Sequence, residues 1–224
     1  MKQHAIIVAS GSGERMMFET PKQFLLLSGL PVLMHTVKKF ADVSGKIIVA
    51  LPEKHIPTWE KLCSVFGFEI PHIVSKGGET RFHSVKNALK KIEDDDSFVA
   101  VHDGVRPVVS AELIRKIFDA AEKNGNAIPF FPLSESIRKI DDNGNSFYAD
   151  RKYFISIQTP QCFKISSLRK AYEGNYNASF TDDATAVELT TGEKIFLIKG
   201  ENQNIKITTL EDLVFAEGLL SNRS

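Results

Sequence analysis

Hydrophobic residues fall into two kinds of pattern that alternate along the chain. Continuous apolar runs, typical of strands buried on both faces of a sheet, occur at Ala5–Ala9, Ile47–Leu51, Ile70–Val74, Phe98–Val101 and Ala127–Phe131. Between them, apolar residues recur at helical spacing over Glu79–Ile92 and after Ser110. The second helix is the clearer, because Ser110 is a preferred N-cap and Asn124-Gly125 supplies a stop.

Such a strand–helix alternation implies right-handed crossovers and a mostly parallel sheet with helices on both faces. The sequence therefore predicts a single Rossmann-like α/β domain. Ligands bind such sheets beyond the carboxyl ends of the strands. Three turns lie at those ends and should converge: the loop after Ala9, Gly77-Gly78 and His102-Asp103-Gly104.

The alternation is interrupted after Pro132, where β-like runs flank Asn143-Gly144, a strong hairpin signal. A hairpin that projects from a parallel sheet has edges and an apolar face to cover. We therefore interpret residues 134–155 as a β-arm for dimerisation rather than a segment that folds back. Later helices are expected at 167–176, 182–190 and from Thr208, where Glu211 completes a capping box, and strands at 195–198 and 205–207. We expect one domain over residues 1–224.

Composition restricts the classes of function. The chain is 42% hydrophobic and 25% charged, which is ordinary for a globular protein. Lys+Arg and Asp+Glu both total 28, so no overall field attracts nucleic acid or an anionic membrane, and any cationic site must be local. Cys63 and Cys162 supply no disulfide framework or metal–thiolate cluster. Because no signal peptide or membrane-length apolar run is present, we expect a cytoplasmic protein.

The first candidate site is Ala9-Ser10-Gly11-Ser12-Gly13-Glu14-Arg15, followed by Lys22. Small residues let backbone N–H groups approach an anion, and two cations supply charge, as a nucleoside triphosphate requires. Met16 stands where a dinucleotide-binding fingerprint needs a small residue, which argues against an NAD-dependent oxidoreductase. No Gly-Lys-Ser/Thr follows for a P-loop. The alternative is a surface turn with two solvated cations.

A second glycine turn, Gly77-Gly78-Glu79, leads into a predicted helix that carries Arg81 and Ser84 on one face. Such a helix start offers free N–H groups and a positive dipole end to an anion or a base. Backbone groups at Ala9 and Gly78, with the Ser84 hydroxyl, could distinguish cytosine from uracil. An ordinary strand-to-helix turn is the alternative.

A third group follows the strand over Phe98–Val101. Asp103 is placed to hold a Mg²⁺–phosphate unit or a substrate hydroxyl, and Arg106 to grip a phosphate or simply to pair with Asp103. His102 is better explained by packing or solvation than as a general base. Weaker candidates are Arg151 at the end of the arm, Thr159, Thr181 beside a helix cap, and Lys206 within an apolar segment.

In order and spacing, these motifs resemble the methylerythritol phosphate cytidylyltransferases of the non-mevalonate isoprenoid pathway, nucleotidyltransferases with a GT-A-like sheet. The match runs nearly end to end, through the glycine loop with Arg15, Pro21-Lys22-Gln23, Gly77-Gly78-Glu79-Thr80-Arg81 with Ser84, His102-Asp103 with Arg106-Pro107, Asp150-Arg151, Thr159-Pro160-Gln161, Thr181-Asp182-Asp183-Ala184 and Asn204-Ile205-Lys206. The resemblance implies transfer of CMP from CTP to 2-C-methyl-D-erythritol 4-phosphate, with Mg²⁺ or another divalent cation. It also implies a homodimer with interlocking arms.

The resemblance further implies a role for each motif. Arg15 and Lys22 would bind the triphosphate and stabilise the transition state. CTP would be held by Ala9, Ser10, Gly11, Gly78, Glu79 and Ser84. The methylerythritol phosphate would be held by Asp103, Arg106, Thr159, Thr181 and Lys206, with Arg151 of the partner subunit. Mg²⁺ would lie mainly on the triphosphate and could lie near Asp103, with no side chain expected as a direct ligand.

Elementary chemistry agrees with this interpretation. The second pKa of a phosphate monoester is about 6, so the acceptor is ionised at neutral pH and needs no general base. Positioning and electrostatic preorganisation would do most of the work.

Three competing functions are open at this point. The nearest is that of the sister family of ribitol phosphate cytidylyltransferases, although Thr181-Asp182-Asp183-Ala184 looks more like the methylerythritol enzymes. A sugar nucleotidyltransferase that uses another base is a more distant candidate. The third is a non-catalytic nucleotide-binding protein of the same fold, which would be expected to lose Arg15, Lys22 or Asp103.

Overall fold

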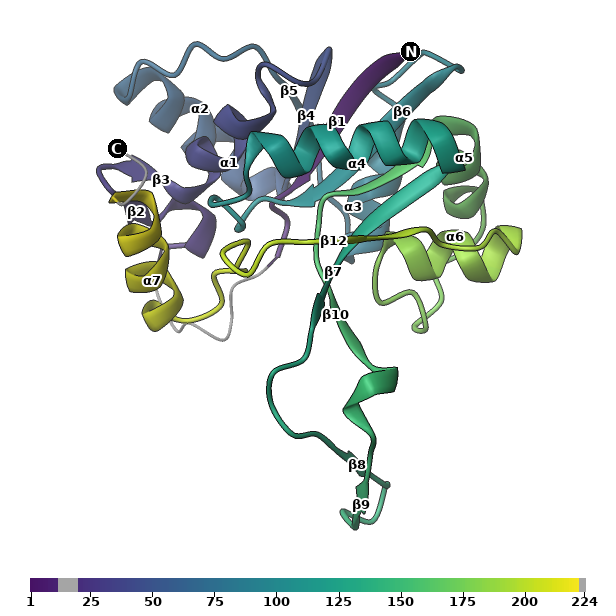
Figure 1. The fold of residues 1–224 in the computed structure, drawn as a ribbon. Helices are drawn as coiled ribbons and strands as arrows, with labels where there is room; N and C mark the ends of the chain where they lie inside the picture. The colour runs from purple at the N-terminus through teal and green to yellow at the C-terminus, as the bar shows by residue number, and fades with distance from the viewer. Residues whose placement is uncertain (12–19, 222–224) are drawn as a thin grey trace.

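The computed structural model describes residues 1–11 and 20–221, so Arg15 and Met16 lie outside the described residues. A central eight-stranded sheet has the order β10-β7-β11-β6-β1-β4-β5, with β12 paired to β7 (Figure 1). Its strands are β1 (Lys2–Val8), β4 (Lys46–Leu51), β5 (Ile73–Lys76), β6 (Ser97–Asp103), β7 (Asn126–Pro132), β10 (Ile155–Ile157), β11 (Gln161–Lys164) and β12 (Leu197–Lys199).

The sheet is mostly parallel, as the sequence predicts. β1 is parallel to β4 and β6, β4 to β5, and β12 to β7. β11 is antiparallel to both β6 and β7, and β10 is antiparallel to β7. The carboxyl ends of β1, β4, β5 and β6 therefore meet at one edge, where the candidate loops begin.

Two of the predicted strands differ from the structure. The run predicted at Ile70–Val74 becomes a strand only from Ile73, after Pro71, which has no N–H to donate to a ladder. The strand predicted over residues 205–207 is wrong. That segment is joined to the body by one backbone hydrogen bond, from Ile207 N–H to Val105 O at 2.9 Å, and belongs to no sheet.

Helices cover both faces of the sheet. The helices are α1 (Val32–Phe40), α2 (Ile56–Val65), α3 (Arg81–Leu89), α4 (Ala111–Asn124), α5 (Ile165–Glu173), α6 (Asp183–Thr191) and α7 (Leu210–Ser221). One core cluster joins α1, α2 and α4 to one face, including Phe40, Trp59 and Phe118. A second joins α3, α5 and α6 to the other face, including Val85 and Leu168. None of the described helices is long and apolar enough to cross a membrane.

Local capping explains where the helices begin and end. The Ser110 hydroxyl accepts the Leu113 N–H at 2.9 Å, and Gly125 ends α4 in the left-handed region with φ +87°, as predicted. The last helix begins one residue later than the predicted capping box. Thr209 and Asp212, rather than Thr208 and Glu211, exchange hydrogen bonds there, because the Asp212 carboxylate reaches two successive N–H groups.

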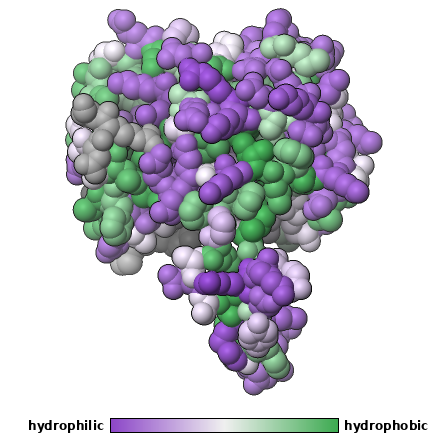
Figure 2. Space-filling view, viewed as in Figure 1, coloured by the Kyte–Doolittle hydropathy of each residue, from purple (hydrophilic) through white to green (hydrophobic). Residues whose placement is uncertain are grey.

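Residues 134–155 form a projecting arm (Figure 1). Strands β7 and β10 pair at its base, and β8 (Arg138–Ile140) and β9 (Ser146–Tyr148) form a separate hairpin at its tip. Gly144 turns that hairpin with φ +80°. Figure 2 shows apolar surface where the arm leaves the body. Large apolar side chains stay exposed along it: Ile140, Phe147, Tyr148, Tyr153, Phe154 and Ile155.

Candidate active site

Three loops meet beyond the carboxyl ends of the parallel strands, as predicted. The Gly104 N–H donates to Val8 O at 2.8 Å, and a Cβ on Gly104 would lie 2.9 Å from the Cβ of Ala9. A Cβ on Gly77 would lie 3.0 Å from the Cβ of Ser10. The loops after β1, β5 and β6 are thus in direct contact, and the glycines make that approach possible.

The first loop is braced from the short helix η2 (Lys22–Phe24). The buried Gln23 side chain donates from Nε2 to Ala9 O at 3.0 Å, which fixes the start of the loop relative to Lys22. Gly11 is exposed and Ser10 is half-buried, so these two residues of the loop are accessible from outside. Arg15, the other predicted triphosphate ligand, lies outside the described residues.

The turn before α3 is tied together by Ser84. Its hydroxyl accepts the Gly78 N–H at 3.0 Å and donates to Thr80 O at 3.0 Å. Ser84 is fully buried, whereas Gly78 and Glu79 are exposed. The sequence predicts that Ser84 contacts the cytosine; the structure instead places its hydroxyl where it shapes the turn that presents Gly78.

Asp103, at the end of β6, is surrounded by three cations. Its carboxylate lies 2.9 Å from Lys206 Nζ, 3.4 Å from Arg106 Nε and 3.6 Å from Arg81 Nε. Burial alone would raise the pKa of the Asp103 carboxyl, but Arg81, Lys206 and Arg106 outweigh it and hold that pKa well below its ordinary value. Asp103 is therefore a permanent anion that gathers predicted acceptor ligands into one cluster.

Arg81 extends this cluster to a second carboxylate. Its guanidinium lies 2.6 Å from Asp183, which is fully buried and also accepts the Tyr172 hydroxyl at 2.6 Å. Burial, and then Asp183, raise the pKa of Tyr172 well above its ordinary value, so this hydroxyl stays a donor. Three cations against two carboxylates leave the cluster with one surplus positive charge, which suits a phosphate ligand.

Arg81 and Asp183 are absent from the site residues that the sequence predicts. Arg81 belongs to the motif of the glycine turn and Asp183 to a helix cap, but neither pattern by itself indicates a ligand role. The available signal is a doubled carboxylate, Asp182-Asp183. The N-cap function uses only one of the two, since Asp182 accepts the Thr185 N–H at 2.8 Å.

The other predicted acceptor residues lie at different distances from the cluster. Thr159 is buried, and its hydroxyl is hydrogen bonded to the Asp103 N–H at 3.1 Å. Thr181 is exposed, two residues before Asp183. Arg151 lies in the arm, in the short helix η4 (Arg151–Tyr153), where its guanidinium donates to Ser134 O. The structure thus brings Thr159 to Asp103 but does not bring Arg151 to the cluster of its own chain.

The residues around Asp103 do not fit a directly bound metal ion. Its carboxylate already faces three cations, which oppose a further divalent charge. Among the described residues, no group of three His, Cys, Asp or Glu side chains is arranged to hold one. The protein's own charges at this position are thus arranged for an anion.

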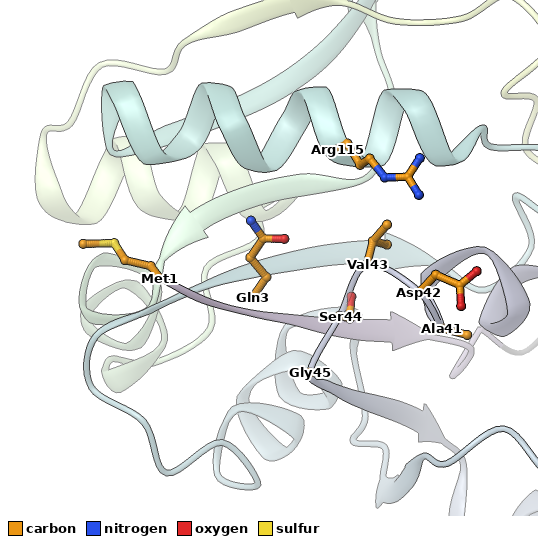
Figure 3. A pocket seen from close by; sticks show the side chains of 8 residues that line it. All are labelled: Met1, Gln3, Ala41, Asp42, Val43, Ser44, Gly45 and Arg115. Carbon is orange, nitrogen blue, oxygen red and sulfur yellow. The ribbon is translucent and has the colours of Figure 1, made fainter.

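A separate pocket lies at the opposite end of the sheet. It is lined by Met1, by Gln3 of β1, by the 41–45 turn and by Arg115 of α4 (Figure 3). Because these residues lie at the amino end of β1, the pocket is remote from the loops that follow the carboxyl ends. It is not part of the candidate active site.

Comparison with known proteins decides the family. A family model described as 2-C-methyl-D-erythritol 4-phosphate cytidylyltransferase matches residues 3–222. The chain belongs to this family. A cytidylyltransferase of that name from Porphyromonas gingivalis is 47% identical over 221 residues, covering 99% of each chain. One from Bacteroides thetaiotaomicron is 43% identical, covering 98% of this chain and all of the relative.

Solved structures of the cytidylyltransferase family share the fold. The enzyme from Anaerococcus prevotii, named 4-diphosphocytidyl-2C-methyl-D-erythritol synthase, superposes with a TM-score of 0.82 at 30% identity, covering 98% of each chain. The 2-C-methyl-D-erythritol 4-phosphate cytidylyltransferase from Thermus thermophilus superposes with a TM-score of 0.80 at 30% identity, covering 99% of this chain and all of the other. The structural similarity to this family therefore extends over nearly the whole chain.

Proposed function

We propose that this protein transfers the CMP moiety of CTP to 2-C-methyl-D-erythritol 4-phosphate, releasing pyrophosphate and forming 4-diphosphocytidyl-2-C-methyl-D-erythritol. The observation that carries the proposal is the position of Arg81. It stands at the start of α3, beside the glycine turn, and reaches Asp103 at 3.6 Å. Arg81 thereby joins a loop suited to a nucleotide to a cluster suited to a phosphate, as transfer of a nucleotidyl group to a phosphate requires.

In this reaction an oxygen of the acceptor phosphate attacks the α-phosphorus of CTP. A new P–O bond forms while the bond to the β-phosphate bridging oxygen breaks, and pyrophosphate takes that electron pair. Because the acceptor is ionised at neutral pH, no proton must be removed. His102 is buried and hydrogen bonded on both ring nitrogens, so it is not available as a base.

The difficulty lies in bringing two anions together. Lys22, with Arg15, would neutralise the triphosphate and the charge that develops on the transferring group. CTP would arrive as its complex with Mg²⁺ or another divalent cation. Lys206, Arg106 and Arg81 would hold the acceptor phosphate, and fixed positions for all these charges would supply much of the acceleration.

Nucleotide recognition would use mainly the backbone. Ser10, Gly11, Gly78 and Glu79 are accessible in the two loops, whereas Ala9 is buried and its carbonyl is engaged by Gln23. Ser84 would act indirectly by fixing Gly78. This arrangement suits a base read by amide groups, which have fixed donor and acceptor directions.

We also propose that the protein is a cytoplasmic homodimer in which Arg151 of one chain completes the acceptor site of the other, with Thr159 and Thr181 lining that site. Two features support the dimer: the arm exposes large apolar side chains, and Arg151 lies away from the cluster of its own chain. A second chain would cover the apolar residues and supply the missing cation.

The first test is pyrophosphate release by the purified protein with CTP and Mg²⁺, offered either methylerythritol phosphate or ribitol 5-phosphate. Release with methylerythritol phosphate alone is expected. Release with ribitol phosphate alone would overturn the acceptor assignment while keeping the nucleotide half. Binding of CTP without release from either acceptor would favour a non-catalytic nucleotide-binding protein of the same fold.

A further inference from the structure

His102 lies at the centre of a hydrogen-bonded chain beneath the acceptor cluster. It is fully buried in β6, and its ring centroid is 5.1 Å from that of Phe40. Its Nε2 lies 3.2 Å from Arg106 O, and its Nδ1 lies 3.0 Å from the Thr159 hydroxyl oxygen. Both ring nitrogens therefore have protein partners, and each partner belongs to a segment that carries acceptor residues.

The partners determine the tautomer of this ring. A carbonyl oxygen can only accept, so Nε2 carries the hydrogen and donates it to Arg106 O. Nδ1 then presents a lone pair, and the Thr159 hydroxyl must donate to it. The same hydroxyl oxygen accepts the Asp103 N–H at 3.1 Å. The orientation of Thr159 is thus fixed, and its oxygen retains one lone pair for a donor such as a substrate hydroxyl.

The imidazole also holds both ends of a short turn. Through Thr159 it fixes the Asp103 backbone, and through Arg106 O it fixes the residue three positions later; Arg106 N–H closes the turn onto Asp103 O at 3.1 Å. The Arg106 guanidinium continues to Asn204 O at 2.7 Å, in the segment that carries Lys206. A change at His102 would therefore move two charged groups of the cluster together.

We propose that His102 is a positioning residue of the acceptor subsite, which orients Thr159 and the Asp103–Arg106 turn without touching either substrate. This inference rests on the proposed function. A histidine that served only the core would influence stability but would not discriminate between the two substrates. Both hydrogen-bond partners of His102, Arg106 and Thr159, are predicted acceptor residues, so the proposal predicts a larger effect on the KM of the acceptor than on that of CTP.

The experiment measures KM for each substrate at saturating concentration of the other, in wild type and in His102→Phe, His102→Asn and His102→Gln. His102→Phe keeps a ring but removes the acceptor of the Thr159 hydroxyl hydrogen and the donor to Arg106 O. We expect it to raise KM for methylerythritol phosphate about ten-fold or more, with KM for CTP unchanged within about two-fold. His102→Asn, whose side-chain oxygen can replace Nδ1, should recover part of that loss by holding Thr159, and His102→Gln should recover less.

His72→Asn is the matched control. His72 also accepts at one ring nitrogen, from Trp59 at 2.9 Å, and donates from the other, to Ile70 O at 2.7 Å, but it lies beside α2. His72→Asn should lower the midpoint temperature of unfolding and leave the KM values for CTP and for methylerythritol phosphate unchanged. A cycle with Thr159→Val adds a second readout: Thr159→Val and His102→Phe break the same hydrogen bond, so their effects on acceptor KM should not add.

Equal rises in both KM values, acceptor KM values that stay at the wild-type level, or full additivity with Thr159→Val would each overturn the inference. If the wild-type protein released no pyrophosphate from methylerythritol phosphate, the proposed function itself would fail. An active wild type whose variants keep the wild-type acceptor KM would overturn only the role of His102. The two failures are therefore distinguishable in the same set of assays.

Discussion

At the scale of single residues, the site is governed by buried charge. Asp103 is exposed by only about a tenth of its side chain, yet it faces Arg81, Arg106 and Lys206. Burial lowers the pKa of the Arg106 guanidinium from its ordinary value, while Asp103 opposes that shift. The carboxylate keeps these cations close together before any ligand binds, so their mutual repulsion is already compensated in the free protein.

We expect Lys22→Ala to reduce kcat about a hundred-fold or more while changing KM for CTP much less, because the lysine is assigned to charge that develops in the transition state. Steady-state pyrophosphate release over a range of CTP concentrations would measure both constants. Lys54→Ala, an exposed lysine outside the candidate site, is the control. A rise in KM alone would contradict the transition-state role and leave Lys22 as a ground-state ligand.

His102 gives stability a specific pH dependence. Burial lowers the pKa of His102 from 6.5 to about 4, and the hydrogen bond to Arg106 O and the charge of Asp103 oppose that shift only in part. Between those values the unfolded chain binds a proton that the folded protein does not. The contribution of neutral His102 to the free energy of unfolding is therefore complete above pH 6.5 and is lost as the pH falls toward 4. The loss amounts to about 3 kcal/mol. Asp103 stays ionised throughout this window.

Urea unfolding at about pH 7 and about pH 4.5 would test this pH dependence. The free energy of unfolding should fall less between those pH values in His102→Asn than in wild type, whatever the absolute stability of the variant. Other titrating groups are shared by the two proteins and cancel in the comparison. Parallel losses in both proteins would show that His102 is protonated in the folded state.

Much of the residue-level site follows from the sequence. Asp103, Arg106 and Lys206 are predicted acceptor ligands, and the structure places both cations within 3.4 Å of the Asp103 carboxylate. Ser84 and Thr159 show what a sequence does not reveal. The sequence shows that a hydroxyl is present but not which groups it bonds to. Here both hydroxyl oxygens accept hydrogen bonds from backbone N–H groups of the protein. Arg81 is missed as a site residue because its role depends on Asp183, which is 102 residues away in sequence.

At the scale of elements, tight turns set the position of the nucleotide loops. A Cβ on Gly78 would overlap the Cβ of His83 in the first turn of α3. Gly78→Ala should displace this turn, break the hydrogen bond to Ser84, and raise KM for CTP about ten-fold. Gly174→Ala is the matched control, because a Cβ there would meet no atom within 4 Å. Similar KM values for the two variants would mean that Gly78 does not shape the nucleotide site.

Elements with strong local signals are predictable, and those decided by distant contacts are not. Ser110 and Gly125 fix α4 through hydrogen bonds and backbone geometry within the helix itself. The segment 205–207 has the apolar alternation of a strand, but Ile207 bonds to the turn after β6 rather than to a sheet edge. In this segment Ile207 is buried and Lys206 contacts Asp103. The resulting alternation of apolar and polar residues is the same as that of a strand, so the pattern alone cannot distinguish the two.

At the scale of the whole molecule, the arm makes a prediction about two chains. Arg151→Ala and Lys22→Ala should each be nearly inactive alone. In a mixture that exchanges subunits, a mixed dimer would have one intact site, with Lys22 from one chain and Arg151 from the other. Random mixing makes half the dimers mixed, so about a quarter of wild-type activity should return. Pyrophosphate release after mixing measures it.

The control for this experiment is each variant mixed with itself under the same exchange conditions. Size-exclusion chromatography would establish that the preparations are dimeric. If dimers exchange and activity stays at the level of the single variants, Arg151 does not act across the subunit boundary. A monomeric wild-type protein with full activity would contradict the dimer proposal as a whole.

The position of β11 in the sheet determines when the sheet can finish folding during translation. β11 lies between β6 and β7, yet it follows the arm in the chain. While a ribosome is still adding the arm, β6 and β7 have no strand between them, and their facing edges can pair with another nascent chain. The preceding 160 residues must therefore wait for residues 161–164 before the sheet can close, and a chain stopped within the arm would be prone to aggregate.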